Sequence, residues 1–161
     1  MKIISLVLAI LVFLSCSAWA QISPPAEEAI KALFPAFQGY NVESHTLDNQ
    51  EIKVFTIIAD NHKVIGWAVV LDEMGKIKPI TFLVGIDIQG KVLEVRVLEY
   101  RDMFGSEIKR RSFLRQFQGK SLKDPLAVGR DIDAVTQATI SSQAAATAVK
   151  KSLEIIQQIK K

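Results

Sequence analysis

Apolar and polar residues alternate along the middle of the chain in patterns that predict β-strands. Strands are expected at residues 51–59, 63–71, 80–88 and 91–99. Residues 80–88 are almost continuously apolar, which indicates a strand buried on both faces. In residues 91–99, Leu93, Val95 and Val97 alternate with Glu94 and Arg96. This alternation predicts one dry and one wet face.

Helical spacing of apolar residues occurs in three other segments. The first follows Ser23-Pro24-Pro25 and ends at Pro35, because proline is tolerated in the first turn of a helix but stops a later one. The second covers residues 106–117, and the third runs from Ser141 or Ser142 to the end of the chain. The second segment has an apolar side and a basic side, the latter formed by Lys109, Arg110, Arg111 and Arg115.

The order of these elements predicts the fold class. Adjacent strands are joined by short turns at residues 60–62 and 89–90. Tight turns give an antiparallel sheet, and the flanking helices must pack on it, so an α+β fold with a single domain is expected. The predicted organisation is a signal peptide at residues 1–20, an N-terminal helix and strands at 21–61, and the domain core at 62–161.

The N-terminus predicts export from the cytoplasm. Lys2 precedes an apolar run at residues 3–14, which is shorter than the roughly 20 residues of a membrane span. Ala18-x-Ala20 matches a signal-peptidase site, so cleavage after Ala20 is favoured. An uncleaved anchor ranks second and lipidation of Cys16 third. A periplasmic location, or one on the outer face of the cytoplasmic membrane, is therefore expected.

Composition narrows the possible chemistry. Cys16 is the only cysteine of the 161 residues, so a chain cleaved after Ala20 can form no disulfide or thiolate metal site. No metal site is expected from the motifs either. The net charge of +3 arises from 20 basic and 17 acidic residues. This near balance does not indicate nucleic acid as a partner.

The isolated polar residues are not typical of a catalytic centre. His45 and His62, the only histidines, are interpreted as surface residues. Glu99 and Asp102 could carry out acid–base chemistry but are better interpreted as solvated loop carboxylates. The basic side of residues 106–117 is interpreted first as a solvated helix face, and second as a docking surface for an acidic partner.

The most informative segment is residues 131–142, Asp-Ile-Asp-Ala-Val-Thr-Gln-Ala-Thr-Ile-Ser-Ser. Its hydroxyl groups are typical of helix caps. A helix N-terminus also presents unpaired N–H groups and a positive dipole, which favour an anion such as a phosphate. The segment therefore predicts a helix start that can hold a phosphate.

Asp133-x-x-Thr136-Gln137-Ala138-Thr139 resembles the flavinylation motif of the FMN-binding domain family, Asp-x-x-Ser/Thr-Gly-Ala-Thr. That family includes the C subunit of sodium-pumping NADH:quinone oxidoreductase and the G subunit of the Rnf-type electron-transport complex. In it the last threonine forms a phosphoester with FMN, installed from FAD by a magnesium-dependent flavin transferase. The resemblance assigns this role to Thr139. It assigns supporting cofactor contacts to Asp133, Thr136, Ala138, Ser141, Ser142 and Gly105.

The resemblance extends over about residues 62–156, with residues 100–105 as the loop on the ligand side. Gln137 departs from it by standing where glycine is usual. The resemblance implies an exported electron-transfer flavoprotein with covalent FMN, not a stand-alone enzyme. Its implied partners are the flavin transferase and a membrane redox complex or a periplasmic electron carrier. Two alternatives stay open: a non-redox binding module that has lost the flavin, and a reversible FMN binder.

Overall fold

The computed structural model describes residues 23–160, apart from the side chain of Asn61. Five strands form one antiparallel sheet in the order β1-β2-β3-β4-β5, so each strand pairs with its neighbour in the chain. The α+β fold with a single domain is thus confirmed. The strands are β1 (Gly39–Leu47), β2 (Gln50–Ile58), β3 (Val64–Met74), β4 (Pro79–Asp87) and β5 (Val92–Tyr100).

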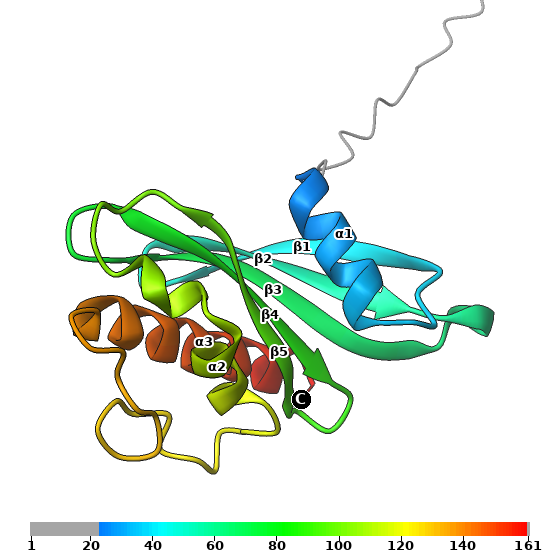
Figure 1. Ribbon diagram of the computed structural model, residues 1–161. Helices are drawn as coiled ribbons and strands as arrows, with labels where there is room; N and C mark the ends of the chain where they lie inside the picture. The colour runs from blue at the N-terminus through cyan, green and yellow to red at the C-terminus, as the bar shows by residue number, and fades with distance from the viewer. Residues whose placement is uncertain (1–22, 161) are drawn as a thin grey trace, which may run out of the picture.

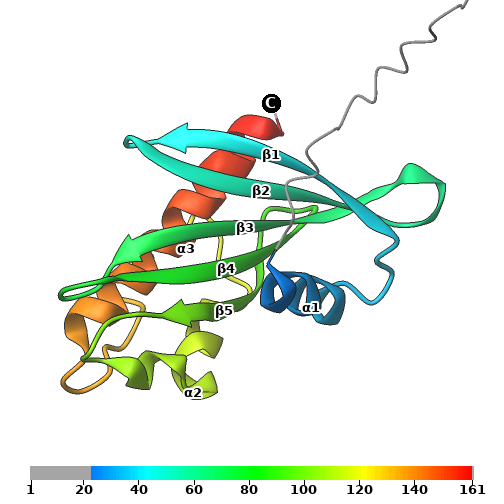
Figure 2. The same ribbon diagram turned by 90° about the horizontal axis from the view of Figure 1, so that it is seen from above.

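Helices cover both faces of the sheet (Figure 1). Helix α1 (Pro24–Leu33) lies on one face, and α3 (Thr139–Ile159) lies on the other together with α2 (Arg111–Leu114). Figure 2 shows β5 at one edge of the sheet, next to α2. Within residues 23–160 no helix is long and apolar enough to cross a membrane. The signal-peptide prediction for residues 1–20 lies outside the described residues.

Side chains that alternate along the strands build two separate cores. Val54 and Val69 point to the α3 face, whereas their neighbours Phe55 and Ala68 point to the α1 face. The larger core contains most of the buried residues of α3, and the smaller one centres on Ile30. Because both faces are covered, β4 is buried on both sides, as its apolar run predicts.

Strand β5 corrects the prediction of one dry and one wet face. Two register shifts, opposite Thr81/Phe82 and Gly85/Ile86, insert extra residues and break the period of two. Val92 and Val95 are buried under α3, while Leu93 and Leu98 pack on the α1 side. Both faces of β5 are therefore partly dry.

The predicted helix at residues 106–117 is also corrected. It is divided into the 3₁₀ turn η2 (Ser106–Lys109), the single turn α2, and the 3₁₀ turn η3 (Arg115–Phe117). Arg110 has extended backbone angles, φ −63° and ψ 133°, which interrupt the helix. The amphipathic pattern still holds, because Phe113 and Phe117 are buried while the four basic side chains are exposed.

Three smaller differences concern element ends. Strand β1 was not predicted, because its residues are mostly polar and it lies at an exposed edge. Residues 60–62 form the 3₁₀ turn η1 (Asp60–His62), and exposed His62 takes a positive φ of 59°. Helix α3 begins at Thr139, two residues before the earlier of the two predicted starts.

Candidate functional site

The loop before α3 has little regular structure and is held by partly buried polar contacts. The Asp131 carboxylate accepts the N–H of Ala127 at 2.9 Å and of Leu126 at 3.2 Å, and it pairs with the Lys120 ammonium at 2.9 Å. Burial works to raise the pKa of Asp131, but these N–H groups and the Lys120 charge outweigh it and lower the pKa. One carboxylate thus fixes the whole turn at residues 126–131.

Gln116 fastens the next part of the loop from the neighbouring helical turn. Its Oε1 accepts the Asp133 N–H at 2.8 Å, and its Nε2 donates to the Asp133 carbonyl at 3.2 Å. Gln116 therefore pairs with the Asp133 backbone as another strand would. The side chain of Asp133 is exposed.

Ser142 connects the first turn of α3 to the motif. Its buried Oγ donates to the carbonyl of Ala138 at 2.9 Å and accepts the N–H of Val135 at 3.1 Å. The predicted capping role of this serine is wrong, because the N-cap is Ala138 and has no side-chain cap. Ser142 instead closes the turn that leads into the helix.

Gln137 explains why glycine is usual at its position in the motif. Its φ is +65°, which lies in the left-handed region. There a side chain with a Cβ costs roughly 1–2 kcal/mol that glycine does not. The turn therefore keeps a glycine-type backbone in this chain although the residue is glutamine.

Ser141 links α3 to the loop at residues 100–105. Its buried Oγ lies 3.1 Å from the Tyr100 hydroxyl and donates to the Phe104 carbonyl at 3.4 Å. The Tyr100 hydroxyl also donates to the Phe104 carbonyl. Burial raises the pKa of Tyr100, so this hydroxyl keeps its proton.

Gly105 makes this junction possible. Its φ of +87° suits glycine, and a Cβ there would lie 2.4 Å from Ser141 Oγ and 3.1 Å from the Tyr100 hydroxyl. The structure thus brings two predicted site residues, Gly105 and Ser141, into contact. Gly105 acts here through its lack of a side chain.

Asp102 locks the same loop to the β3–β4 hairpin. Its carboxylate accepts the N–H groups of Ile77 at 3.0 Å and Met103 at 2.7 Å. The Ile77 hydrogen bond lowers the pKa of Asp102 most, against the opposing effect of burial. The interpretation of Asp102 as a solvated carboxylate is therefore wrong, because it is buried and structural. Glu99 is exposed and pairs with Arg101.

Thr139 stands at the centre of the arrangement as the first residue of α3. Its side chain is exposed, as is that of Thr136. Within residues 23–160 the Thr139 hydroxyl has no hydrogen-bond partner, and the backbone N–H groups of Thr139, Ile140 and Ser141 have no protein acceptor. No acidic side chain lies in this first turn. The helix start is therefore electropositive and accessible.

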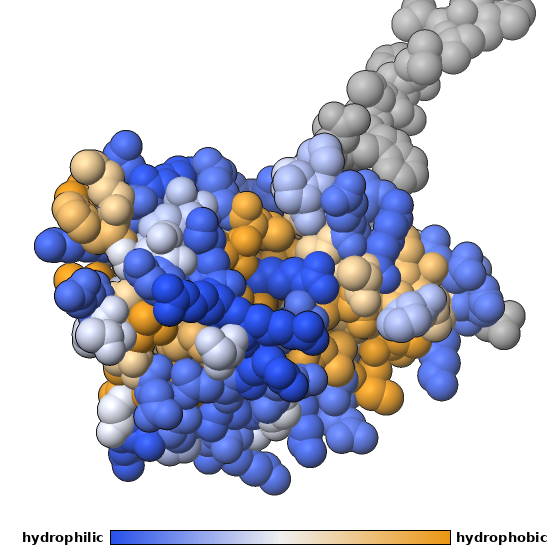
Figure 3. Space-filling model, in the orientation of Figure 1, coloured by the Kyte–Doolittle hydropathy of each residue, from blue (hydrophilic) through white to orange (hydrophobic). Residues whose placement is uncertain are grey.

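Apolar side chains are exposed around this helix start. Ile140 is 51% exposed, Phe104 50% and Ile77 53%, and the Lys76 ammonium lies 4.8 Å from the centre of the Phe104 ring. In Figure 3 apolar atoms gather at the end of the molecule where the β3–β4 hairpin and the start of α3 meet. None of the walls of three surface cavities, of about 460, 340 and 390 Å³, includes residues 131–142. The exposed Thr139 thus lies outside these three cavities.

The family comparison agrees with this geometry. Residues 75–154, from the turn just after β3 through most of α3, match the FMN-binding domain family. The chain belongs to this family and is a flavin-binding protein. No curated protein matches the chain.

Two contributors to the site were not predicted. The sequence indicates Tyr100 only as the first residue of the loop at 100–105, and Gln116 only as part of the helix expected at 106–117. A tyrosine at the end of a largely apolar strand is a weak signal of a buried hydroxyl contact. Nothing in the sequence pairs Gln116 with Asp133, because 17 positions separate them.

Proposed function

We propose that the protein is an exported electron-transfer flavoprotein that carries FMN as a phosphoester on Thr139. The observation that supports this best is the position of Thr139 itself. Its free, exposed hydroxyl sits beside the unpaired N–H groups of Thr139 and Ile140, which can bind phosphate oxygens. A nucleophilic hydroxyl and an anion site in one helical turn suit a phosphoester linkage.

The residues present fit FMN at this helix start. The N–H groups of the exposed Thr139 and Ile140 would hold the phosphate, and the exposed Phe104 and Ile140 offer apolar surface to the ring. Bound FMN supplies one- and two-electron transfer. The part of this chain is to hold the phosphate and to keep the acceptor hydroxyl reachable from outside.

The exposed position of Thr139 favours covalent over reversible binding. A micromolar ligand is held by only about 8 kcal/mol at standard state. Thr139 is exposed and lies outside the walls of these three cavities, so the proposal gives the holding of the flavin to the phosphoester. Outside the cytoplasm a phosphoester would prevent its loss. The electron partners would be a membrane redox complex or a periplasmic carrier.

Mass spectrometry tests the attachment. The protein is produced together with an active flavin transferase, FAD and magnesium, and its peptides are mapped. We expect an FMN-sized mass on Thr139 in the wild type and none in Thr139→Ala, which should still fold because the replaced side chain is exposed. Thr136→Ala is the matched control and should keep the flavin. A mass on Thr136 or Ser141 would show that the motif register is wrong.

One observation favours a second candidate function, a binding module that has lost its flavin. Gln137 occupies a left-handed position where the family has glycine, so the transferase could meet an unsuitable turn. Denaturing precipitation separates the candidates. Retained yellow colour indicates covalent FMN, released colour indicates reversible binding, and a colourless protein made with a competent transferase supports the lost-flavin module.

Export has its own test. Cleavage after Ala20 gives a mature N-terminus at Gln21, which intact-mass analysis of exported protein would detect. Retention of residues 1–20 would favour the anchor instead.

A further inference from the structure

The largest of the three cavities lies on a different part of the molecule from Thr139. It measures about 460 Å³ and runs between β5 and the helical turns η2, α2 and η3. We call it the β5 groove. Its walls are formed by Leu93, Glu94, Val95, Arg96, Val97, Lys109, Arg111, Leu114, Arg115 and Gln118.

One wall of the β5 groove is the edge of a strand. Residues 93–97 all line it, although successive side chains of a strand point to opposite faces. Five consecutive residues can share a cavity when it runs along the backbone at the edge of the sheet. β5 is an edge strand, paired only with β4. Five residues span about 16 Å at roughly 3.3 Å each.

Backbone pairing on this edge already occurs at one end of the groove. Val92 donates its N–H to the Lys120 carbonyl at 2.9 Å and accepts the Gly119 N–H at 2.8 Å. Beyond Val92, within residues 23–160, no further backbone partner is found on the outer edge of β5. Such an edge can accept an added strand.

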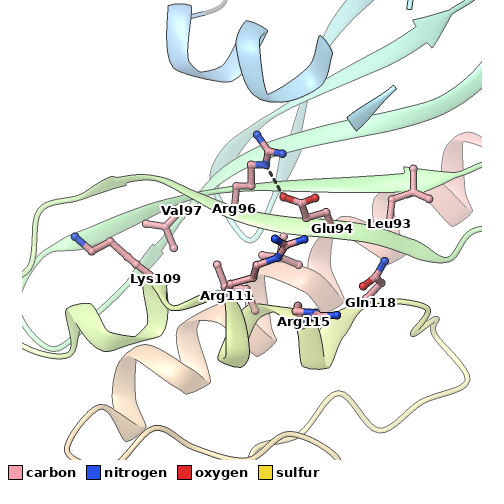
Figure 4. A pocket seen from close by; sticks show the side chains of 10 residues that line it. Leu93, Glu94, Arg96, Val97, Lys109, Arg111, Arg115 and Gln118 are labelled. Atoms are coloured by element: carbon pink, nitrogen blue, oxygen red, sulfur yellow. Dashed lines mark hydrogen bonds and ion pairs between the residues drawn. The ribbon is translucent and has the colours of Figure 1, made fainter. Parts of the chain in front are cut away.

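The opposite wall is cationic (Figure 4). Arg111 and Arg115 rise from the turns below β5, and no carboxylate pairs with either of them within residues 23–160. The single acidic group of the groove, Glu94, is held by Arg96 at 2.6 Å. Four cationic side chains therefore face one carboxylate. In Figure 3 a strongly hydrophilic band crosses this face of the molecule.

We propose that the β5 groove binds an extended acidic segment of a partner protein, which adds as a strand to β5. The strand edge supplies backbone hydrogen bonds, and Arg111 and Arg115 select acidic side chains. A second copy of the chain fits less well, because its own cationic wall would approach this one. A flat anionic membrane could not reach the strand edge inside the groove. The proposal is independent of the flavin on Thr139.

Titration of ¹⁵N-labelled protein with defined peptides tests the proposal. The probes are an acetylated hexapeptide of alternating Val and Asp, the same peptide with Lys for Asp, and the acidic peptide with alternate backbone nitrogens methylated. We expect the acidic peptide to shift the amide signals of residues 93–97. The Lys peptide and the methylated peptide should each bind at least about tenfold more weakly.

Matched charge reversals locate the site. Arg111→Glu and Arg115→Glu should each weaken the acidic peptide at least about fivefold, because both residues line the groove. Arg110→Glu is the control, since Arg110 is exposed in the same basic cluster but does not line the groove. It should change affinity less than about twofold. All three side chains are exposed, and an unchanged melting temperature would verify folding.

Other outcomes overturn the proposal. If the methylated peptide bound as tightly as the unmethylated one, binding would depend on charge attraction alone and not on strand addition. Equal losses in the three variants would indicate a general electrostatic field. Binding of vesicles containing 30% phosphatidylglycerol, with none of the acidic peptide, would identify a membrane surface. If no probe bound, the basic side chains of residues 106–117 would be a solvated helix face without a partner.

Discussion

Gln137 shows how a single backbone angle can be tested in this motif. Its φ of +65° is strained for glutamine. Glycine would remove roughly 1–2 kcal/mol of this strain. It would also raise the conformational entropy of the unfolded chain, which lowers the free energy of unfolding by about 0.4–1 kcal/mol. We expect Gln137→Gly to raise the free energy of unfolding by up to about 1.5 kcal/mol, measured by urea denaturation. It should also preserve or improve flavin attachment.

Thr136→Gly is the matched control for this change. Thr136 is also exposed, but its φ is not positive, so glycine can relieve no strain there. The control should lose roughly 0.5–1 kcal/mol. Equal destabilisation by both substitutions would show that the left-handed turn at Gln137 carries no strain.

Gly105 permits a comparison between backbone strain and steric overlap. Gly105 and Gly129 have similar positive φ values, 87° and 82°. A Cβ at Gly105 would lie 2.4 Å from Ser141 Oγ, whereas at Gly129 nothing lies within 4 Å. Gly129→Ala should therefore cost only the strain of roughly 1–2 kcal/mol. Gly105→Ala should lower the melting temperature further and loosen the Tyr100–Ser141 contact.

At the scale of elements, the loop before α3 depends on the Asp131 carboxylate. Its pKa is lowered in the folded protein, from an ordinary value of about 3.9. Its contribution is therefore present above about pH 4 and is lost as the pH falls through the lower folded pKa. Asp131→Asn should cost about 1–3 kcal/mol at pH 7, since it removes a partly buried charged acceptor.

Urea denaturation at several pH values checks this expectation. The difference between wild type and Asp131→Asn should shrink below pH 4, where the wild-type carboxylate also becomes protonated. Asp133→Asn is the control, because the Asp133 side chain is exposed and should change stability by less than about 0.5 kcal/mol. If the difference in stability did not change with pH, the effect of Asp131→Asn would come from the geometry of the asparagine amide and not from the loss of the carboxylate charge.

The elements that could be predicted are those in which the spacing of apolar residues in the sequence matches the spacing of buried side chains in the structure. β4 was recognised because nearly all of its side chains are buried, and α1 because its apolar stripe lies between Pro25 and Pro35. Bulges erased the expected period in β5, and the extended backbone of Arg110 divided a helix whose amphipathic pattern was continuous. Such local irregularities depend on tertiary contacts, which a one-dimensional pattern does not contain.

The central residue of the candidate site could be predicted from the sequence, but the residues that support it could not. Thr139 could be placed from the motif because its neighbours are adjacent in sequence. Its supports come from distant segments: Tyr100 is 41 positions from Ser141. Both serines are predicted to cap α3, but both are buried. Ser141 contacts the loop at residues 100–105, and Ser142 closes the turn that leads into the helix. The preference of serine for helix caps predicts its role well only when its side chain faces solvent.

At the scale of the whole molecule, one sheet joins the family-matched segment to the part before it. The match begins at residue 75, yet α1, β1, β2 and the whole of β3 precede it. β3 pairs with β4 along its length, and α1 packs over β4 and β5. The N-terminal elements therefore complete the hydrophobic core on the second face of the matched strands.

This arrangement predicts cooperative unfolding of the described chain. Ile30 in α1 is fully buried in the smaller core, so Ile30→Ala should cost about 2–5 kcal/mol. Trp67, on the other face of the sheet, is the only tryptophan after residue 20 and reports on the larger core. Its fluorescence and the far-ultraviolet circular dichroism should shift together in urea. Ala32→Gly, at an exposed position of the same helix, is the control and should cost only about 1 kcal/mol. If Ile30→Ala instead separated the two transitions, α1 and its core would form a unit that unfolds independently of the flavin-binding segment.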